Sequence, residues 1–367
     1  MQTRLLATDP KPALDEAVAA AVDLLHAGQP VALPTETVYG LAAVATDPDA
    51  VRRVFEAKER PSHDPLIVHV NSRAMLDQVA DIPPELESIV ATLTGQFWPG
   101  ALTLVLPKSS AIPDQVTAGL PTVAVRRSAH PVFARVIKSL DQPLAAPSAN
   151  RFGRISPTSA RAVLAELEGR IPLVLDGGAC AEGVESTIVK PAPPDKPGGK
   201  PVLHILRAGP VTPDDLKRFG KLNWTATAPK PRRPHAHPLD PVPPTVVEAP
   251  GMLDAHYSPV TPLRLLASPG EFQPQPDRRY ALLSFRGDPD DGYLDLAEFE
   301  ETVVLSPGSG KLPEAAVRFY FLLRHLDDLG VDEIIAEPIP ERGVGIALQD
   351  RLRRAAAGHH RPATDPS

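Results

Sequence analysis

The chain has 367 residues, of which 43% are hydrophobic and 23% are charged, and its formal net charge is −7. This length predicts two globular domains, because a single core rarely grows beyond about 250–300 residues. The acidic balance argues against binding nucleic acid over a broad surface, since proteins of that class are usually basic. With Cys180 as its single cysteine, the chain cannot build a disulfide framework or a four-cysteine zinc site.

Hydropathy gives no indication of a membrane protein. No run of consecutive apolar residues reaches the length of about 20 that spans a bilayer, and the N-terminus lacks the apolar core of a signal peptide. We therefore expect a cytoplasmic protein.

Strand-like and helix-like segments alternate through the first 221 residues. A helix is predicted from Asp47 to Lys58, because Asp47 suits an N-cap, Pro48 suits the first helical position, and Val51 and Val54 share one face. Short apolar runs predict strands at residues 31–33, 66–70, 101–106, 123–127, 173–175, 187–189 and 203–206. Further helices are expected near Met75, Leu86, Phe133 and Val163. This alternation indicates an α/β domain over residues 1–221.

Proline-rich stretches separate this region from a second one. Residues 191–201 read as a surface hairpin loop, and residues 229–250 hold eight prolines, too many for an interior helix or strand. We predict a linker over residues 222–250, a smaller α/β domain over 251–357 and a polar tail over 358–367. In the smaller domain, strands are expected at 263–266, 280–285, 303–305 and 334–336, and helices at 314–329 and 345–357.

Three polar clusters lie close to predicted strands. Thr35-Glu36-Thr37 follows the run 31–33, Lys58 and Arg60 end the first predicted helix, and Ser148 and Asn150 follow another probable strand. A lysine and an arginine together suit a phosphate chain or a carboxylate. For Lys58 and Arg60, the alternative is favourable placement of cations at a helix C-terminus. The clusters together indicate a pocket for an anionic, polyol-bearing ligand.

Two further strands carry ionisable residues. Arg126 and Arg127 are adjacent at a strand end, so one of them faces inward and needs an anionic partner. His69 lies in an apolar strand, where a core histidine with satisfied hydrogen bonds is the favoured interpretation. Glu185-Ser186-Thr187 precedes another strand and adds hydroxyl groups.

Other motifs of nucleotide or metal chemistry are incomplete. The segment Gly308-Ser309-Gly310-Lys311 resembles the end of a P-loop, but its first glycine is missing, and Leu312 stands where a serine or threonine would bind Mg²⁺. We therefore do not expect a nucleotide site there. The sequence shows no dinucleotide fingerprint, no His-Glu-x-x-His and no catalytic triad.

The polar clusters, in this order, resemble the threonylcarbamoyl-AMP synthase family, also called YrdC-like proteins. Residues 250–252 and 256–259, with the domain behind them, resemble the long two-domain form of that family. The resemblance implies an open, twisted mixed α/β sheet with a basic concave cavity, followed by a smaller Rossmann-like domain. The matching catalytic-domain segments are residues 34–41, 58–69, 146–150, 153–158, 183–187 and 205–209.

The resemblance also implies an activity. Such a nucleotidyltransferase condenses L-threonine, bicarbonate or CO₂, and ATP with Mg²⁺ into threonylcarbamoyl-AMP and pyrophosphate. A downstream tRNA threonylcarbamoyl transferase complex uses the product for the t⁶A modification of tRNA. Neither a membrane nor a stable nucleic-acid complex is expected, and the linker of such proteins can lie over the cavity mouth.

Site residues transfer by position in the matching motifs. Lys58 and Arg60 are the implied catalytic residues, and no protein metal ligand is expected. The implied threonine site comprises Thr37, His69, Arg126, Ala146 and Ser186. For His69, this assignment replaces the interpretation as a core histidine. The implied ATP site comprises Arg60, Asp64, Thr122, Ser148, Asn150, Ser156, Arg207 and Tyr257. Asp64 stands where the family often has asparagine.

Three other functions are consistent with parts of the pattern. A double-stranded RNA or tRNA-binding module without catalysis could use a basic concavity, although the net charge disfavours it. A carbamoyltransferase of the hydrogenase-maturation type carries a similar domain but also needs cysteine-rich zinc fingers. A degenerate regulator is disfavoured because both signature motifs are intact.

Overall fold

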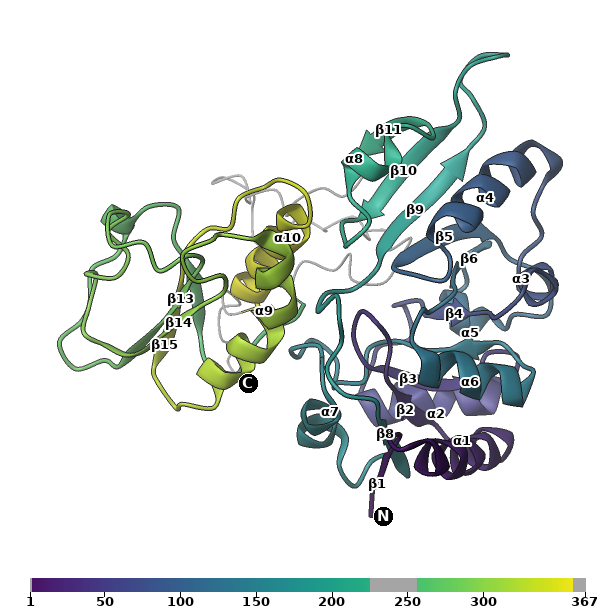
Figure 1. Ribbon diagram of the computed structural model, residues 1–367, viewed down its shortest axis with the longest axis horizontal. Helices are drawn as coiled ribbons and strands as arrows, with labels where there is room; N and C mark the ends of the chain where they lie inside the picture. Colours follow the sequence, from purple (N-terminus) through teal and green to yellow (C-terminus); the bar gives the residue numbers. More distant parts are fainter. Residues whose placement is uncertain (1, 225–255, 359–367) are drawn as a thin grey trace, which may run out of the picture.

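The computed structural model describes residues 2–224 and 256–358, which form two α/β domains, each around its own sheet (Figure 1). Within residues 2–224, an eleven-stranded sheet has the order β1-β8-β2-β3-β7-β4-β6-β5-β9-β10-β11. Both parallel and antiparallel pairs occur in it, so the predicted mixed sheet is confirmed. Its strands are β1 (Arg4–Ala7), β2 (Val31–Leu33), β3 (Gly40–Val44), β4 (Ile67–His69), β5 (Leu102–Pro107), β6 (Thr122–Arg126), β7 (Leu144–Ala145), β8 (Leu173–Asp176), β9 (Thr187–Ala192), β10 (Val202–Arg207) and β11 (Lys221–Trp224).

Helices flank this sheet, and the predicted start of one of them is confirmed in detail. The Asp47 side chain accepts hydrogen bonds from the backbone N–H groups of Asp49 and Ala50, and Pro48 is the first helical residue of α2. The helices of the first domain are α1 (Lys11–His26), α2 (Pro48–Lys58), α3 (Arg73–Val79), α4 (Pro84–Phe97), α5 (Asp114–Thr117), α6 (Pro131–Leu140), α7 (Ala160–Leu167) and α8 (Pro213–Leu216).

The predicted strands of the first domain are present, with ends shifted by at most three residues. The hairpin predicted at residues 191–201 joins β9 to β10. Four strands were not predicted by range: β1, β3, β7 and β11. Gly40 opens β3, and it permits close approach, because a Cβ there would lie 3.3 Å from the Cβ of Ala146.

The second domain is a four-stranded parallel sheet within residues 256–358, in the order β12-β15-β13-β14. The predicted elements are present, although β14 begins four residues earlier than expected. The elements are β12 (Leu263–Leu265), the 3₁₀ turn η1 (Pro269–Glu271), β13 (Tyr280–Ser284), β14 (Phe299–Val304), α9 (Leu312–Asp327), β15 (Glu333–Ala336) and α10 (Gly345–Ala357).

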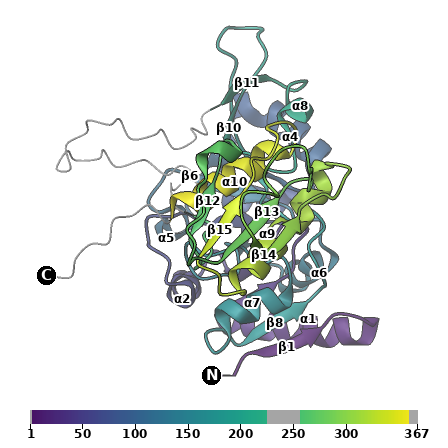
Figure 2. The same ribbon diagram turned by 90° about the vertical axis from the view of Figure 1, so that its left-hand side faces the viewer.

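Helices α9 and α10 lie between the second sheet and the first domain, as two perpendicular views show (Figures 1 and 2). One apolar cluster crosses this boundary, with Val38 and Val184 from the first domain packed among residues such as Phe319 of α9. Gly183, at φ +72°, lies against α9, since a Cβ there would be 2.2 Å from the backbone oxygen of Ala316. The second domain therefore rests on the loops that follow the strands of the first.

Part of the predicted organisation cannot be followed in space. The predicted linker begins inside β11, and its residues 225–250 lie outside the described residues, as do residues 359–367 of the predicted tail. Among the described residues, no helix has the length and apolarity required to cross a bilayer.

The segment that resembles the end of a P-loop satisfies its own polar groups. The hydroxyl groups of Ser306 and Ser309 donate to the carboxylate of Glu314 at 2.8 and 3.3 Å. The backbone N–H of Lys311 donates to the Ser306 hydroxyl at 2.8 Å. The two hydroxyl groups near this segment are therefore bonded to a glutamate of α9.

Candidate functional site

The polar loops of the first domain meet at one cavity, which the first residues of the second domain cover. Among the described residues, its walls carry three arginines and one glutamate, so their positive charge predominates. The lining residues are Thr35, Thr37, Val38, Gly40, Arg60, Ile67, His69, Arg126, Ala146, Pro147, Ser148, Glu185, Ser186, Arg207, His256 and Tyr257.

The loop after β2 is a tight hydroxyl-capped turn. The Thr35 hydroxyl accepts from the backbone N–H groups of Thr37 and Val38 at 3.1 and 3.2 Å. It also donates to the Val38 carbonyl at 2.6 Å. This local bonding, typical of threonine in turns, fixes the Thr37 hydroxyl at the cavity wall.

Arg126 is held rigidly at the end of β6. It donates through Nη1 to the Thr37 hydroxyl at 3.0 Å and through Nη2 to Glu36. Glu36 also accepts from the Ser128 hydroxyl and from the backbone N–H of Ala129. Burial alone would raise the pKa of Glu36, but Arg126 and Ser128 bring that pKa below its ordinary value. The inward arginine and its anionic partner are thus confirmed.

The Nε of Arg126 has no hydrogen-bond partner among the described residues. A buried N–H group without a partner is costly, so it marks a position where a ligand acceptor would bind. The neighbouring Arg127 is exposed.

His69 lies beside Arg126, because both side chains come from paired positions of β4 and β6. It is buried, its ring centroid is 4.5 Å from that of Phe133, and its Nδ1 has no partner among the described residues. Burial and the charge of Arg126 bring the pKa of His69 well below its ordinary value, so the ring is neutral. The interpretation as a satisfied core histidine is wrong.

Lys58 lies behind the cavity wall. Its side chain is 1% exposed, and Nζ donates to the carbonyl oxygens of Ser148 and Asn150. The backbone N–H of Phe152 donates to the Lys58 carbonyl at 2.8 Å. Burial and the charge of Arg60 bring the pKa of Lys58 well below its ordinary value. Lys58 therefore holds the loop that presents Ser148.

Arg60 is on the wall, and its partner Asp64 is behind it. Nη2 of Arg60 lies 2.8 Å from Oδ2 of Asp64, and both side chains are almost fully buried. Arg60 also donates to the carbonyls of Asp64 and Pro65 at 3.1 and 2.8 Å. Burial raises the pKa of Asp64, against the opposing effect of Arg60. Asp64 thus orients the Arg60 side chain from behind the cavity wall.

Ser186 and Arg207 lie together on the cavity wall. Arg207 donates to the Ser186 carbonyl at 3.1 Å and to its hydroxyl at 3.2 Å, and that hydroxyl is also 2.7 Å from the Thr103 hydroxyl. Gly209 allows the two segments to approach, because a Cβ there would lie 2.4 Å from the backbone nitrogen of Thr187.

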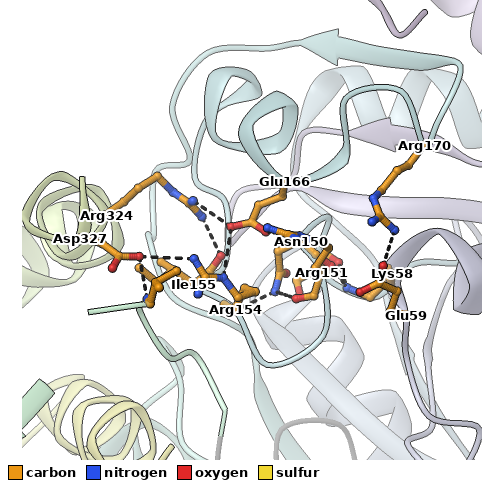
Figure 3. A network of polar contacts seen from close by, with 12 residues as sticks. Lys58, Glu59, Asn150, Arg151, Arg154, Ile155, Glu166, Arg170, Arg324 and Asp327 are labelled. Atoms are coloured by element: carbon orange, nitrogen blue, oxygen red, sulfur yellow. Dashed lines mark hydrogen bonds and ion pairs between the residues drawn. The ribbon is translucent and has the colours of Figure 1, made fainter. Parts of the chain in front are cut away.

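The loop behind Asn150 is tied to the second domain by a polar network (Figure 3). Nδ2 of Asn150 donates to the carbonyls of Arg151 and Arg154 at 2.8 and 2.9 Å. Both arginines approach the buried carboxylate of Glu166, at 3.3 and 3.9 Å. Arg324 of α9 reaches the same carboxylate at 3.0 Å.

This network continues along the loop. Arg324 also donates to the Ile155 carbonyl at 2.8 Å, and Asp327 of α9 lies 3.4 Å from Arg154 (Figure 3). One helix of the second domain therefore braces the loop to which Lys58 is bonded.

His256 and Tyr257 close one side of the cavity. Tyr257 is buried at φ +64°, and its hydroxyl has no hydrogen-bond partner among the described residues. Its ring centroid is 4.2 Å from that of His256 and 6.0 Å from that of Tyr320. Burial and the nearby cations Arg60 and Lys58 bring the pKa of His256 well below its ordinary value, which keeps it neutral.

The structure brings most of the predicted site residues together. All five residues of the implied threonine site line the cavity. Four residues of the implied ATP site also line it: Arg60, Ser148, Arg207 and Tyr257. The remaining predicted residues are not on the walls: Lys58, Asp64, Asn150 and Ser156 are buried, and Thr122 is half-buried at the start of β6.

Three polar wall residues lie in segments that the sequence analysis named, but they were not assigned to the threonine or ATP site: Thr35, Glu185 and His256. Each is adjacent to, or two positions from, a residue that was assigned. Their proximity in sequence was the available signal.

The residues present do not form a magnesium site of their own. Within residues 2–224 and 256–358, no group of three or more histidine, cysteine or acidic side chains could hold a metal ion. Asp64, a buried carboxylate close to this cavity, is engaged by Arg60. Mg²⁺ is often held by substrate phosphates and water with few protein ligands, so an ion could still arrive bound to a nucleotide.

Comparison with known proteins agrees with this geometry. The family profile described as "Telomere recombination" (Sua5, YciO, YrdC) matches residues 23–209. The profile described as "Threonylcarbamoyl-AMP synthase, C-terminal domain" matches residues 211–357. A crystal structure of Pyrococcus abyssi Sua5 complexed with L-threonine is similar, with a TM-score of 0.76, 33% sequence identity and coverage of 97% of this chain and 98% of that one.

Similar curated sequences carry one name. The chain is 37% identical over 348 residues to threonylcarbamoyl-AMP synthase of Pyrococcus abyssi, covering 92% of this chain and 93% of that protein. It is 38% identical over 361 residues to the Bacillus subtilis protein of the same name, covering 96% of each. The chain therefore belongs to the threonylcarbamoyl-AMP synthase family, in its two-domain form.

Proposed function

We propose that this protein is an L-threonylcarbamoyladenylate synthase, which condenses L-threonine, bicarbonate or CO₂, and ATP into threonylcarbamoyl-AMP and pyrophosphate. The observation that carries the proposal is one cavity in which Arg126, held by Glu36, faces the same space as Arg60 and Arg207. Such a cavity has cationic groups for a carboxylate and for a phosphate chain at once.

The threonine half of the proposal uses the groups left without partners. The carboxylate of threonine would accept from Nε of Arg126, whose other nitrogens are already engaged. Neutral His69 and the hydroxyl groups of Thr37 and Ser186 would bind the amine and hydroxyl of the substrate, beside Ala146. The structure of P. abyssi Sua5 complexed with L-threonine supports threonine as a ligand of this cavity.

The ATP half of the proposal uses the remaining cationic and hydroxyl groups of the cavity. Arg60 and Arg207 would bind the phosphates, and Ser148 and the Tyr257 hydroxyl would donate to phosphate or ribose oxygens. The buried residues Lys58, Asp64, Asn150 and Ser156 would act through the loops that they support.

The reaction needs no protein nucleophile. The neutral amine of threonine attacks CO₂ with loss of a proton to solvent, or bicarbonate with loss of water, and forms a carbamate. A carbamate oxygen then attacks the α-phosphorus of ATP in line, a new P–O bond forms, and the bond to pyrophosphate breaks. The protein contributes orientation and fixed positive charge, and near-attack placement accounts for about 7–11 kcal/mol in favourable cases. Mg²⁺ would neutralise phosphate charge as part of the nucleotide substrate.

The product is a reactive mixed anhydride, so we propose that a downstream tRNA threonylcarbamoyl transferase complex receives it in the cytoplasm. The direct test is detection of threonylcarbamoyl-AMP by mass spectrometry, with threonine and bicarbonate omitted in turn. Product that depends on both supports the proposal. Absence of product from the complete mixture, with RNA binding that weakens steeply as salt rises, would instead favour a non-catalytic RNA-binding module.

A further inference from the structure

Glu185 is a carboxylate on the wall of a cavity that binds anions in the proposed function. It is buried, adjacent in sequence to Ser186, and faces the same space as Arg207. An uncompensated carboxylate at this place would repel a triphosphate and attract the Arg207 guanidinium. Its charge therefore needs a partner that does not come from the substrate.

That partner comes from the second domain. Nε of Arg351, on α10, donates to Glu185 Oε2 at 3.1 Å, and the hydroxyl of Tyr320, on α9, lies 3.0 Å from both carboxylate oxygens. Arg351 is fully buried, and it also donates through Nη2 to the Ala208 carbonyl at 2.8 Å. Arg351 thus touches the chain beside Ser186 and the chain beside Arg207.

The charges around Glu185 come from several elements. Arg207 belongs to β10, Arg351 is also 3.1 Å from Asp350, and the Arg351 guanidinium lies 5.5 Å from the Tyr257 ring centroid. Burial would raise the pKa of Glu185, but Arg351 and Arg207 bring that pKa below its ordinary value. The Glu185–Arg351 pair is therefore ionised and close to neutral as a unit.

We propose that Arg351 is a positioning residue for nucleotide binding, which cancels the charge of Glu185 and so keeps the Arg207 guanidinium directed to the phosphates of ATP. The inference rests on the proposed function of the cavity. It assigns to the second domain an electrostatic contribution to a site in the first domain, made through a side chain that does not touch the substrate.

The test is ATP binding to the full-length protein by isothermal titration calorimetry, with adenosine as an uncharged probe. In Arg351→Gln, we expect the Kd for ATP to rise about tenfold, because one buried negative charge is uncovered near the triphosphate. Adenosine binding should stay unchanged. Arg351→Lys keeps the charge and should bind ATP within about threefold of the parent. Arg353→Gln is the matched control, since Arg353 lies on the same helix and pairs with Glu341 at the surface.

Glu185→Gln distinguishes charge from structure. It removes the negative charge, so ATP should bind as tightly as to the parent or more tightly. The variant should nevertheless unfold at a lower urea concentration, because Arg351 loses its charged partner. The double variant Glu185→Gln with Arg351→Gln should recover most of the affinity lost in Arg351→Gln. A purely structural role predicts instead that both single variants weaken ATP and adenosine together, in proportion to their loss of stability, and that result would overturn the inference.

The pH dependence gives a second readout. In Arg351→Gln, burial raises the pKa of Glu185 with less opposition, so ATP affinity should fall as pH rises and Glu185 ionises. The parent protein should lack this dependence between pH 6 and 8, because Glu185 is already ionised. A parent protein that does not bind ATP would refute the proposed function itself. If the parent protein binds ATP but the Kd values of the variants do not follow the sign of the charge change, only the role of Arg351 would be refuted.

Discussion

Replacing Lys58 by methionine removes a cation that contacts protein carbonyls rather than the cavity. Its Nζ donates to the carbonyls of Ser148 and Asn150, and the side chain is 1% exposed. Methionine has a similar length and donates no hydrogen bond. Two buried carbonyl groups would lose their charged donor, at about 1–3 kcal/mol each. The relieved cost of burying an amine offsets part of this, so we expect a net loss of about 2–4 kcal/mol in the free energy of unfolding.

The same change should reduce catalysis, because the loop that presents Ser148 would shift. A displacement of about 1 Å in a positioning group costs about 10²-fold in rate, so kcat should fall by about 10² or more. The KM for ATP should rise as well, whereas the KM for threonine should change little, because Ser148 belongs to the proposed ATP side.

The assay is steady-state release of pyrophosphate, combined with urea denaturation followed by fluorescence. Lys138→Met is the matched control, since Lys138 is an exposed lysine at the end of α6, and both of its readouts should equal those of the parent. Arg60→Met offers a contrast, because it removes a wall residue and should also lower kcat by about 10². Parental turnover and an unchanged unfolding midpoint in Lys58→Met would refute the reasoning.

Four further changes test other parts of the structure. A double-mutant cycle of Glu166→Gln and Arg324→Met, followed by urea denaturation, should give a coupling energy of about 1.5–3 kcal/mol, as for hydrogen bonds to charged groups. If the two losses in unfolding free energy were simply additive, the interdomain pair would have no role in stability. Burial holds the pKa of His256 well below its ordinary value, so on acidification the unfolded state takes up the proton before the folded state does. The free energy of unfolding should therefore fall below pH 6.5, by at most about 1.4 kcal/mol between pH 7.5 and 5.5. His256→Phe should remove this contribution to the pH dependence of stability. Gly183→Ala should loosen the contact with α9 and be detected as faster proteolysis between the domains; resistance equal to the parent would show that the close approach is dispensable. Arg126→Lys should raise the KM for threonine about tenfold, since a lysine cannot donate to Glu36, Thr37 and substrate from one planar group, and an unchanged KM would exclude Arg126 from the threonine site.

Local patterns in the sequence were sufficient for most of the secondary structure. Asp47 and Pro48 predict the start of α2, because a cap and a first-turn proline act through bonds to the next few residues. The strand β1 was not predicted and β7 was predicted without a range, since β1 is a largely exposed edge strand and β7 has two residues. Both owe their conformation to pairing with distant segments, which hydropathy does not record.

The ordered polar motifs determined the family and most of the cavity, because residues that follow neighbouring strands meet at one sheet edge. They could not determine which atoms face the ligand. Only the tertiary structure shows that Lys58 turns away to hold a loop, and that Glu185 is neutralised by Arg351, 166 residues further along the chain. The physical reason is that burial and charge pairing depend on how two domains pack, whereas periodicity and motif spacing report only on neighbours in sequence.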